Sequence, residues 1–159
     1  MKKILIILVA LVSFGLSANA QCIYYINSGQ FKLPDGTTVT GYSGVNNSKS
    51  TDQKDQYGQY YYNNSENTNV KGKGAIPPGT YYVKGVSSSI TSYTIILDKD
   101  KSNVGYNERD NDFRIHGDNS ANNASKGCII LDLTSRKKIA DEFNRLYSKG
   151  QYLILYVYE

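Results

Sequence analysis

The stretches FRIHGD at residues 113–118 and SKGCIIL at residues 125–131 decide how this chain is interpreted. Each has the short apolar pattern of a strand that borders a glycine-containing loop. The first strand ends at His116, the one histidine of the sequence, and the second starts at Cys128. Both side chains therefore fall at strand–loop junctions, where active sites are commonly built.

One cysteine and one histidine are sufficient for acyl transfer. A thiol becomes a strong nucleophile when it is deprotonated, and imidazole is the usual neighbouring base. We therefore interpret Cys128 as a nucleophile and His116 as its base. Gly127 lets backbone N–H groups approach a substrate oxygen closely, as an oxyanion site requires. A lone histidine without a Cys/His cluster argues against zinc, so we expect no metal and no cofactor.

Four neighbouring residues are further candidates for the site. Arg114 lies two positions before His116 and shares its strand face, so it either grips a substrate carboxylate or is an ordinary surface residue. Ser125 either hydrogen-bonds within the site or stabilises the loop. Asp118 either orients His116 or forms the turn, and the turn is favoured. Gly117 lets His116 project at the sheet edge, and we count it with the substrate-binding residues.

Residues 1–20 have the anatomy of a secretory signal peptide. Lys2 and Lys3 are followed by a short apolar run and by the small-residue cleavage site ANA at residues 18–20. The run is too short to anchor the chain in a bilayer. We therefore expect an exported protein, periplasmic or secreted, that does not span a membrane. Gln21 is a poor context for lipidation of Cys22.

The remaining residues, 21–159, are expected to form a single domain with a hydrophobic core of its own. Without the two signal-peptide lysines, the net charge falls from +4 to about +2. No block of basic residues occurs, so nucleic acid is not an expected partner. In an exported protein, Cys22 and Cys128 also suggest a disulfide, an alternative that competes with catalysis.

Short runs of tyrosine, valine, isoleucine and threonine recur between turn signals and predict a mainly β domain. The sequence PDG at residues 34–36 predicts a tight turn between two strands. The stretch 44–73 is rich in asparagine, serine and lysine and predicts a long loop with one short strand, either solvated surface or a substrate-facing flap. Expected strands cover residues 22–27, 30–33, 38–43, 79–86, 93–97, 112–116, 128–131 and 152–158.

One amphipathic helix is expected near the C-terminus, packed on the sheet. Asp132 or Thr134 can cap its start, and Gly150 supplies its stop. Its apolar face is predicted to consist of Ile139, Ala140, Phe143, Leu146 and Tyr147.

The pattern HG…SxGCI, formed by residues 116–117 and 125–129, resembles the catalytic signature of L,D-transpeptidases of the YkuD-like fold. Two upstream stretches, GYSG at residues 41–44 and GAIPPGTYY at residues 74–82, are similar to a small L,D-transpeptidase-like family that includes antibacterial effectors of type VI secretion. Lys126 stands where the commoner enzymes have a second histidine, and this departure favours the small effector-like branch.

The resemblance implies a β-sandwich or barrel in which Cys128 attacks a carbonyl of a peptidoglycan stem peptide and His116 is the base. An amine acceptor would then give cross-linking or D-amino-acid exchange, and water would give L,D-carboxypeptidase activity. The implied partners are peptidoglycan stem peptides and, for a toxin, an immunity protein. The alternative is a non-catalytic envelope-binding domain with a tyrosine-rich surface and a Cys22–Cys128 disulfide.

Overall fold

The computed structural model describes residues 20–45, 54–99, 112–118 and 125–159. Of the predicted signal peptide, residues 1–20, all but Ala20 lie outside the described residues. No helix in the described part of the chain is long and apolar enough to cross a membrane.

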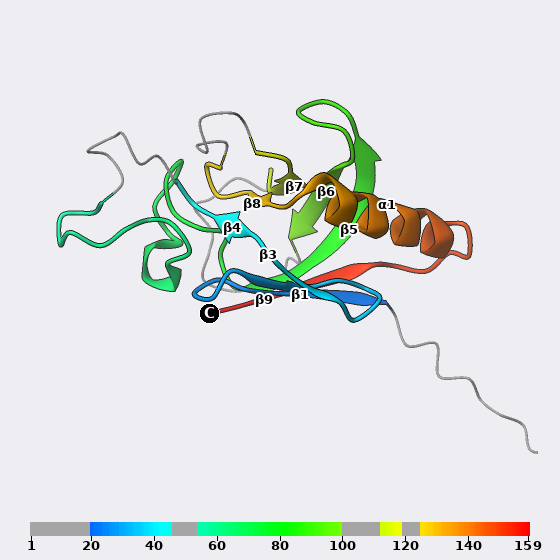
Figure 1. The fold of residues 1–159 in the computed structure, drawn as a ribbon, viewed down its shortest axis with the longest axis horizontal. Coiled ribbons are helices and arrows are strands. Elements are labelled where there is room, and N and C mark those ends of the chain that lie inside the picture. Colours follow the sequence, from blue (N-terminus) through cyan, green and yellow to red (C-terminus); the bar gives the residue numbers. More distant parts are fainter. Residues whose placement is uncertain (1–19, 46–53, 100–111, 119–124) are drawn as a thin grey trace, which may run out of the picture.

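The fold is mainly β, as predicted, with one α-helix in the described residues (Figure 1). The strands form one sheet in the order β3-β2-β1-β9-β5-β6-β7-β8-β4. Most neighbours are antiparallel, but β1 pairs with β9 and β7 pairs with β8 in parallel. The strands are β1 (Gln21–Tyr25), β2 (Gln30–Lys32), β3 (Thr38–Thr40), β4 (Tyr42–Ser43), β5 (Gly79–Ser87), β6 (Thr94–Lys99), β7 (Arg114–His116), β8 (Ile129–Ile130) and β9 (Ile154–Tyr158).

The sheet curls into a nearly closed barrel because its two edge strands are joined by a single residue. Residues 38–43 were expected to form one strand, but Gly41 divides them into β3 and β4. The Gly41 N–H donates to Gly29 O at 2.8 Å, which ties the break to the β1–β2 turn. A Cβ at Gly41 would lie 2.5 Å from Leu131 Cδ2, so only glycine permits this close approach.

The interior of the barrel follows the two-residue alternation of its strands. Tyr24 in β1, Tyr81 in β5 and Leu155 in β9 are each fully buried, whereas Tyr25 and Tyr158 point outward and are largely exposed. Burial of each large apolar side chain contributes roughly 1.5–3 kcal/mol. The predicted PDG turn is confirmed, since Thr37 N–H donates to Asp35 Oδ1 at 2.9 Å between β2 and β3.

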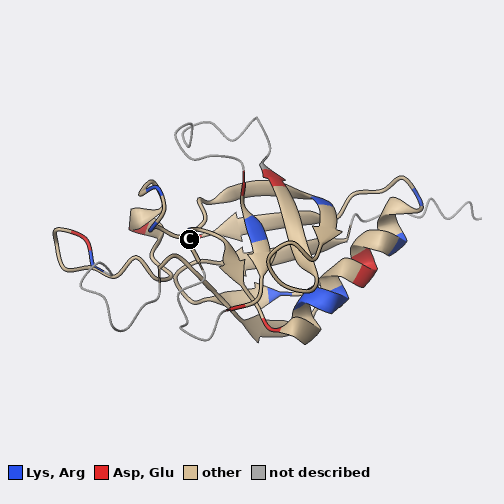
Figure 2. Cartoon of the chain, turned by 90° about the horizontal axis from the view of Figure 1, so that it is seen from above, with Lys and Arg blue, Asp and Glu red and all other residues tan. Residues whose placement is uncertain are grey.

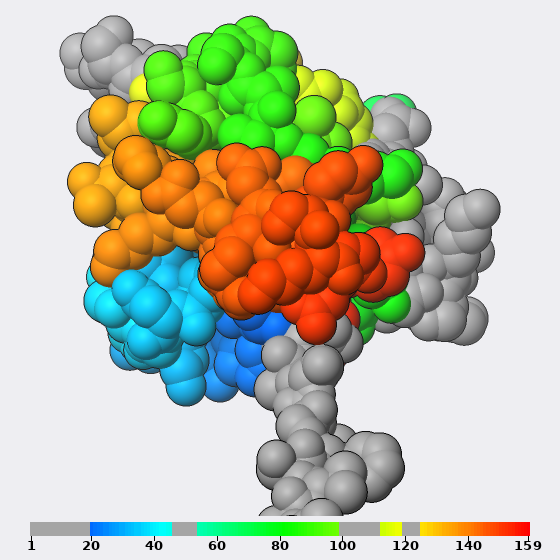
Figure 3. Space-filling model, turned by 90° about the vertical axis from the view of Figure 1, so that its right-hand side faces the viewer, coloured from blue at the N-terminus to red at the C-terminus, as the bar shows by residue number. Residues whose placement is uncertain are grey.

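The helix α1 (Leu133–Tyr147) begins at Asp132, whose Oδ1 accepts from Ser135 N–H at 2.9 Å. It lies between the β5–β6 hairpin and the strands β1–β3 and covers that side of the barrel (Figure 3). Charged residues alternate along its outer surface, whereas the strands carry few (Figure 2). The predicted apolar face is confirmed except for Tyr147, which is 71% exposed because the helix ends there.

The predicted long loop is described for residues 54–73. It contains no strand within that range, only an isolated bridge between Lys54 and Tyr60 and a 3-10 turn, Ser65–Asn67. The expected short strand is therefore wrong here, because the Asp55 carboxylate accepts from the Tyr57 and Gln59 N–H groups and closes a local turn instead.

Candidate active site

Strand register places the candidate catalytic residues on one face of the sheet. His116 pairs with Ile130 of β8, and Ile130 pairs with Tyr42 of β4, so these three side chains point to the same face. Ile115 and Ile129, one residue away on each strand, belong to the hydrophobic core. Cys128 directly precedes β8, two residues before Ile130, and extending the alternation of β8 by one residue predicts that its thiol lies on the His116 face.

The position of the His116 ring fixes which nitrogen carries the proton. Its Nδ1 lies 2.8 Å from the carbonyl oxygen of Gly117, and a carbonyl can only accept, so Nδ1 is the protonated nitrogen. Nε2 is then the nitrogen with a free lone pair, as a general base requires. Burial lowers the pKa of His116 below 6.5, and the nearby guanidinium of Arg136 lowers it further, so the ring is neutral at pH 7.

Ser125 holds the loop that carries Cys128. Its hydroxyl is fully buried, donates to Cys128 O at 2.6 Å, and accepts from the N–H groups of Gly44 and Gly127. Three contacts from one oxygen fix the loop against β4. Because the Gly127 N–H is bonded to Ser125, Gly127 acts in this structure through its backbone turn, at φ +116°, and its oxyanion role stays a prediction.

The GYSG stretch at residues 41–44 packs on the cysteine segment along its whole length. Ser43 Oγ donates to Gly127 O at 3.1 Å and accepts from Ile76 N–H at 2.7 Å, which joins both upstream motifs to the Cys128 loop. Gly44 has φ +89°, and a Cβ there would lie 2.3 Å from Tyr61 O. The two motifs therefore share a physical role, which is to support the segment that presents the thiol.

Comparison with known proteins identifies the family of the chain. The model of one protein family, the Tlde1 domain, matches residues 37–154. The chain belongs to the Tlde1-domain family. This is a family of L,D-transpeptidase-like effectors of type VI secretion. No curated protein and no solved structure was found to match the chain.

The Tlde1 domain of this chain extends from β3 into β9 and includes both halves of the site, His116 with Gly117 and Ser125 with Cys128. The first two strands, β1 and β2, precede the matched residues. They nevertheless complete the barrel, since β1 pairs with β9 and Phe31 of β2 is fully buried.

The two cysteines of this Tlde1-domain protein are both free thiols. The disulfide of the alternative interpretation is therefore wrong in this structure. Cys22 lies in β1 with 1% exposure, and burial raises its thiol pKa far above the usual value. Cys128 is half-buried directly before β8, which is far from β1 in the strand order.

Arg114 is less suited to a substrate carboxylate than its sequence position suggests. Its Nε and Nη2 both donate to Asp112 Oδ1, at 3.0 and 2.7 Å, and its Nη1 donates to Ser89 Oγ. The guanidinium is thus already paired, although its charge also lowers the pKa of His116. Asp118 is exposed, and its charge raises the pKa of His116 by less than the two arginines lower it. Its expected role in a turn stays a prediction.

Two residues that matter to the site were missed by sequence reasoning. Asn63 adopts φ +44°, and its Oδ1 accepts from both Ser43 N–H at 2.8 Å and Tyr24 Oη at 2.9 Å. It therefore links the long loop to the strand beside Cys128. Arg136, in the first turn of α1, lies against Gly117 directly after the base, where a Cβ would be 2.7 Å from Nη2.

Replacing Ser125 with alanine is expected to destabilise the fold by about 2–4 kcal/mol, since two buried N–H groups lose their acceptor. Urea denaturation of the two proteins measures the difference. The exposed Ser88, replaced in the same way, is the matched control and should change stability by less than about 0.5 kcal/mol. Equal stability of the Ser125 variant and the wild type would show that its hydrogen bonds do not hold the loop.

Proposed function

We propose that this protein is an exported cysteine acyltransferase that acts on peptidoglycan stem peptides, as an L,D-transpeptidase, an L,D-carboxypeptidase or both. The single observation that supports the proposal is the buried His116, whose Nδ1 is bonded to the Gly117 carbonyl so that Nε2 keeps its lone pair, on the strand that pairs with β8 directly after Cys128. The family assignment supports the same chemistry.

The proposed reaction has two steps. His116 takes the thiol proton, and the Cys128 sulfur attacks the carbonyl after a diamino-acid L-centre of the stem. The C–N bond to the terminal D-residue then breaks, and its amine leaves with the proton held by His116. In the second step an amine or a water molecule loses a proton to His116 and attacks the thioester. The thiol is restored, and the product is a new amide or a free acid.

The mature protein should be tested directly on muropeptides. Residues 21–159 are incubated with a purified tetrapeptide muropeptide, with and without added D-amino acid, and the products are identified by mass spectrometry. We expect loss of the terminal residue in water, exchange in the presence of the amino acid, or cross-linked dimers. Unchanged muropeptides under all conditions would overturn the proposal.

The structure supplies a control for this assay. Cys22 is 1% exposed, whereas Cys128 is half-buried, so iodoacetamide should alkylate the folded protein once, at Cys128. Singly alkylated protein should then be inactive. If activity survives complete modification of Cys128 in protein that remains folded, a thioester mechanism at Cys128 is excluded.

The biological setting follows from the family. Effectors of this kind would act on the wall in the periplasm of a rival cell, and the producer would then need an immunity protein. Expression directed to the periplasm of a sensitive bacterium should lyse or round the cells. Growth unaffected by such expression, from protein that is active on muropeptides, would instead favour remodelling of the producer's own wall.

A further inference from the structure

A pocket of about 380 Å³ opens beside the candidate catalytic residues. Neither Cys128 nor His116 lines it. Two residues next to His116 do: Gly117, which follows it in the chain, and Ile130, its partner on β8. The lining residue Ile130 is two residues after Cys128, which is roughly 7 Å along an extended chain. The pocket is therefore adjacent to the reacting atoms and separate from them.

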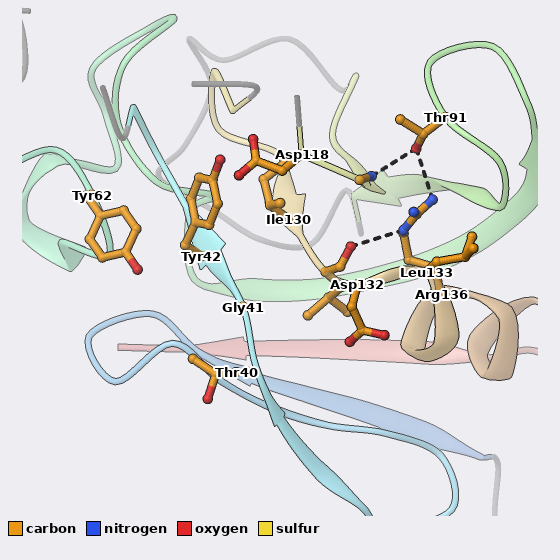
Figure 4. Close-up of a pocket in the computed structure, with 12 residues that line it drawn as sticks. Thr40, Gly41, Tyr42, Tyr62, Thr91, Asp118, Ile130, Asp132, Leu133 and Arg136 are labelled. Carbon is orange, nitrogen blue, oxygen red and sulfur yellow. Dashed lines mark hydrogen bonds between the residues drawn. The ribbon is translucent and has the colours of Figure 1, made fainter. Parts of the chain in front are cut away.

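A buried guanidinium forms one wall of this pocket (Figure 4). Arg136 is 5% exposed. Its Nε donates to Leu131 O at 3.1 Å, and its Nη1 donates to Thr91 Oγ1 at 2.9 Å and to Ser92 O. These bonds orient the group rigidly and use neutral acceptors alone.

An anion compensates the same guanidinium only in part, since burial lowers the pKa of Arg136 and the nearby charge of Asp132 raises it by less. No ion pair of the described residues includes Arg136, and Nη2 makes no hydrogen bond within them. A buried cation is costly unless an anion compensates it. Nη2 lies close to Gly117, where a Cβ would be 2.7 Å from it. Residue 117 therefore has no side chain that could cover Nη2.

The remaining charges of the pocket are negative. Asp118 and Asp132 also line it, and Asp132 is partly engaged as the cap of α1. One cation and two carboxylates give the lining a net negative charge, which disfavours a simple anion. A ligand that carries a carboxylate and an ammonium group side by side matches both signs.

We propose that this pocket binds the zwitterionic end of an α-amino acid, with its carboxylate on Arg136 Nη2 and its ammonium group toward Asp118. The inference rests on the proposed function, because it assigns a substrate subsite of the same reaction. Two sources share this chemistry: a free D-amino acid that serves as the acceptor, and the D-centre of a diaminopimelate side chain in the stem peptide.

Binding is measured on the full mature chain with Cys128 replaced by alanine, so that no reaction occurs. The probes are D-alanine, D-alaninamide and N-acetyl-D-alanine, titrated by NMR with the Gly117 amide as the reporter. D-alanine should bind about 10- to 100-fold more tightly than the other two, since each lacks one charge-assisted interaction. This comparison needs no change in the pocket. Equal affinity for the three probes would overturn the proposal.

Two variants test the residue itself. Arg136→Gln should weaken D-alanine binding at least about tenfold, and Arg136→Lys should restore part of it, because lysine keeps the charge without the planar fork. In the active enzyme Arg136→Gln should raise the KM for the amino-acid acceptor or the stem, with a much smaller change in kcat. If kcat instead falls by as much as KM was expected to rise, and KM is unchanged, Arg136 has a structural role and the proposal is contradicted.

Competition distinguishes the two sources. A tetrapeptide with meso-diaminopimelate that displaces D-alanine, while its lysine counterpart does not, assigns the pocket to the donor stem. D-alanine binding that neither peptide disturbs assigns it to the free acceptor. Both results support a zwitterion subsite. Because binding is read without catalysis, an inactive wild-type protein that still binds D-alanine would refute the proposed function and leave this subsite intact.

Discussion

Replacing Cys128 with alanine should abolish turnover of muropeptides, with a fall in kcat/KM of at least about a thousandfold. No other described side chain on this face replaces the thiol, since the face is completed by Ile130 and Tyr42. The variant should fold normally, because Cys128 is half-buried at the start of a strand and its backbone carbonyl bond to Ser125 does not involve the sulfur. Product formation is measured by mass spectrometry, and folding by circular dichroism.

Cys22→Ala is the matched control. It removes the second thiol from the core at β1, costs about 1–2 kcal/mol of stability by leaving a small cavity, and should leave activity unchanged. Full activity in the Cys128 variant, or complete loss in the Cys22 variant with its fold retained, would reassign the nucleophile. The comparison separates a catalytic cysteine from a structural one.

Replacing His116 with asparagine should lower kcat/KM by about 10²- to 10⁴-fold, the usual contribution of a general base. Asparagine can still donate a hydrogen bond to the Gly117 carbonyl, as Nδ1 does, but offers no base in place of Nε2. A fall of less than about threefold would show that another group deprotonates the thiol. The steady-state rate on a single stem peptide measures the difference.

The same variant should change the pH profile. Burial lowers the pKa of His116 below 6.5, so the acidic limb of wild-type kcat/KM should lie below pH 6.5. The asparagine variant should lose that limb and rise with pH as the thiol itself ionises, near pH 8.5 for an ordinary cysteine. A wild-type acidic limb above pH 6.5 would contradict the buried, neutral imidazole.

Stability should respond to pH in the corresponding direction. The unfolded chain binds a proton at His116 near pH 6.5, whereas the folded chain binds it at a lower pH. As pH falls through that interval, the unfolded state binds more protons and the folded state loses stability. The stability that the neutral His116 contributes to the fold is fully present above pH 6.5. Thermal unfolding at pH 7.5 and 5.5 should therefore show a smaller difference for His116→Asn than for the wild type.

Much of the fold was predictable from local pattern. Short β-favouring runs located the described strands to within a few residues, except that residues 38–43 form two strands, and the PDG turn was predicted. Of the two candidate helix caps, Asp132 is the one observed. The order of the strands was not predictable, because it depends on contacts between distant segments. Nothing local in residues 38–43 indicates that Gly41 joins the two edges of a curled sheet.

The candidate nucleophile and base were proposed from the sequence and stay predictions, whereas two of the residues that support their segments were missed. The HG and SxGC patterns identified His116 and Cys128, but Asn63 lies in a polar loop where many asparagines look alike, and its positive φ leaves no sequence signal. Arg136, by contrast, did leave a signal in the sequence. It precedes Ile139 by three residues and Phe143 by seven, so it falls on the apolar face of α1. An arginine in that position indicates a buried cation with a specific role.

The position of β9 has a consequence for how the domain forms. This last strand lies between β1 and β5, so residues 154–158 join the beginning of the described chain to its middle. Until those residues are available, β1 has no parallel partner and the barrel cannot close. The native topology can therefore assemble only after residues 154–158 have been synthesised, and a chain truncated before them is expected to remain unfolded.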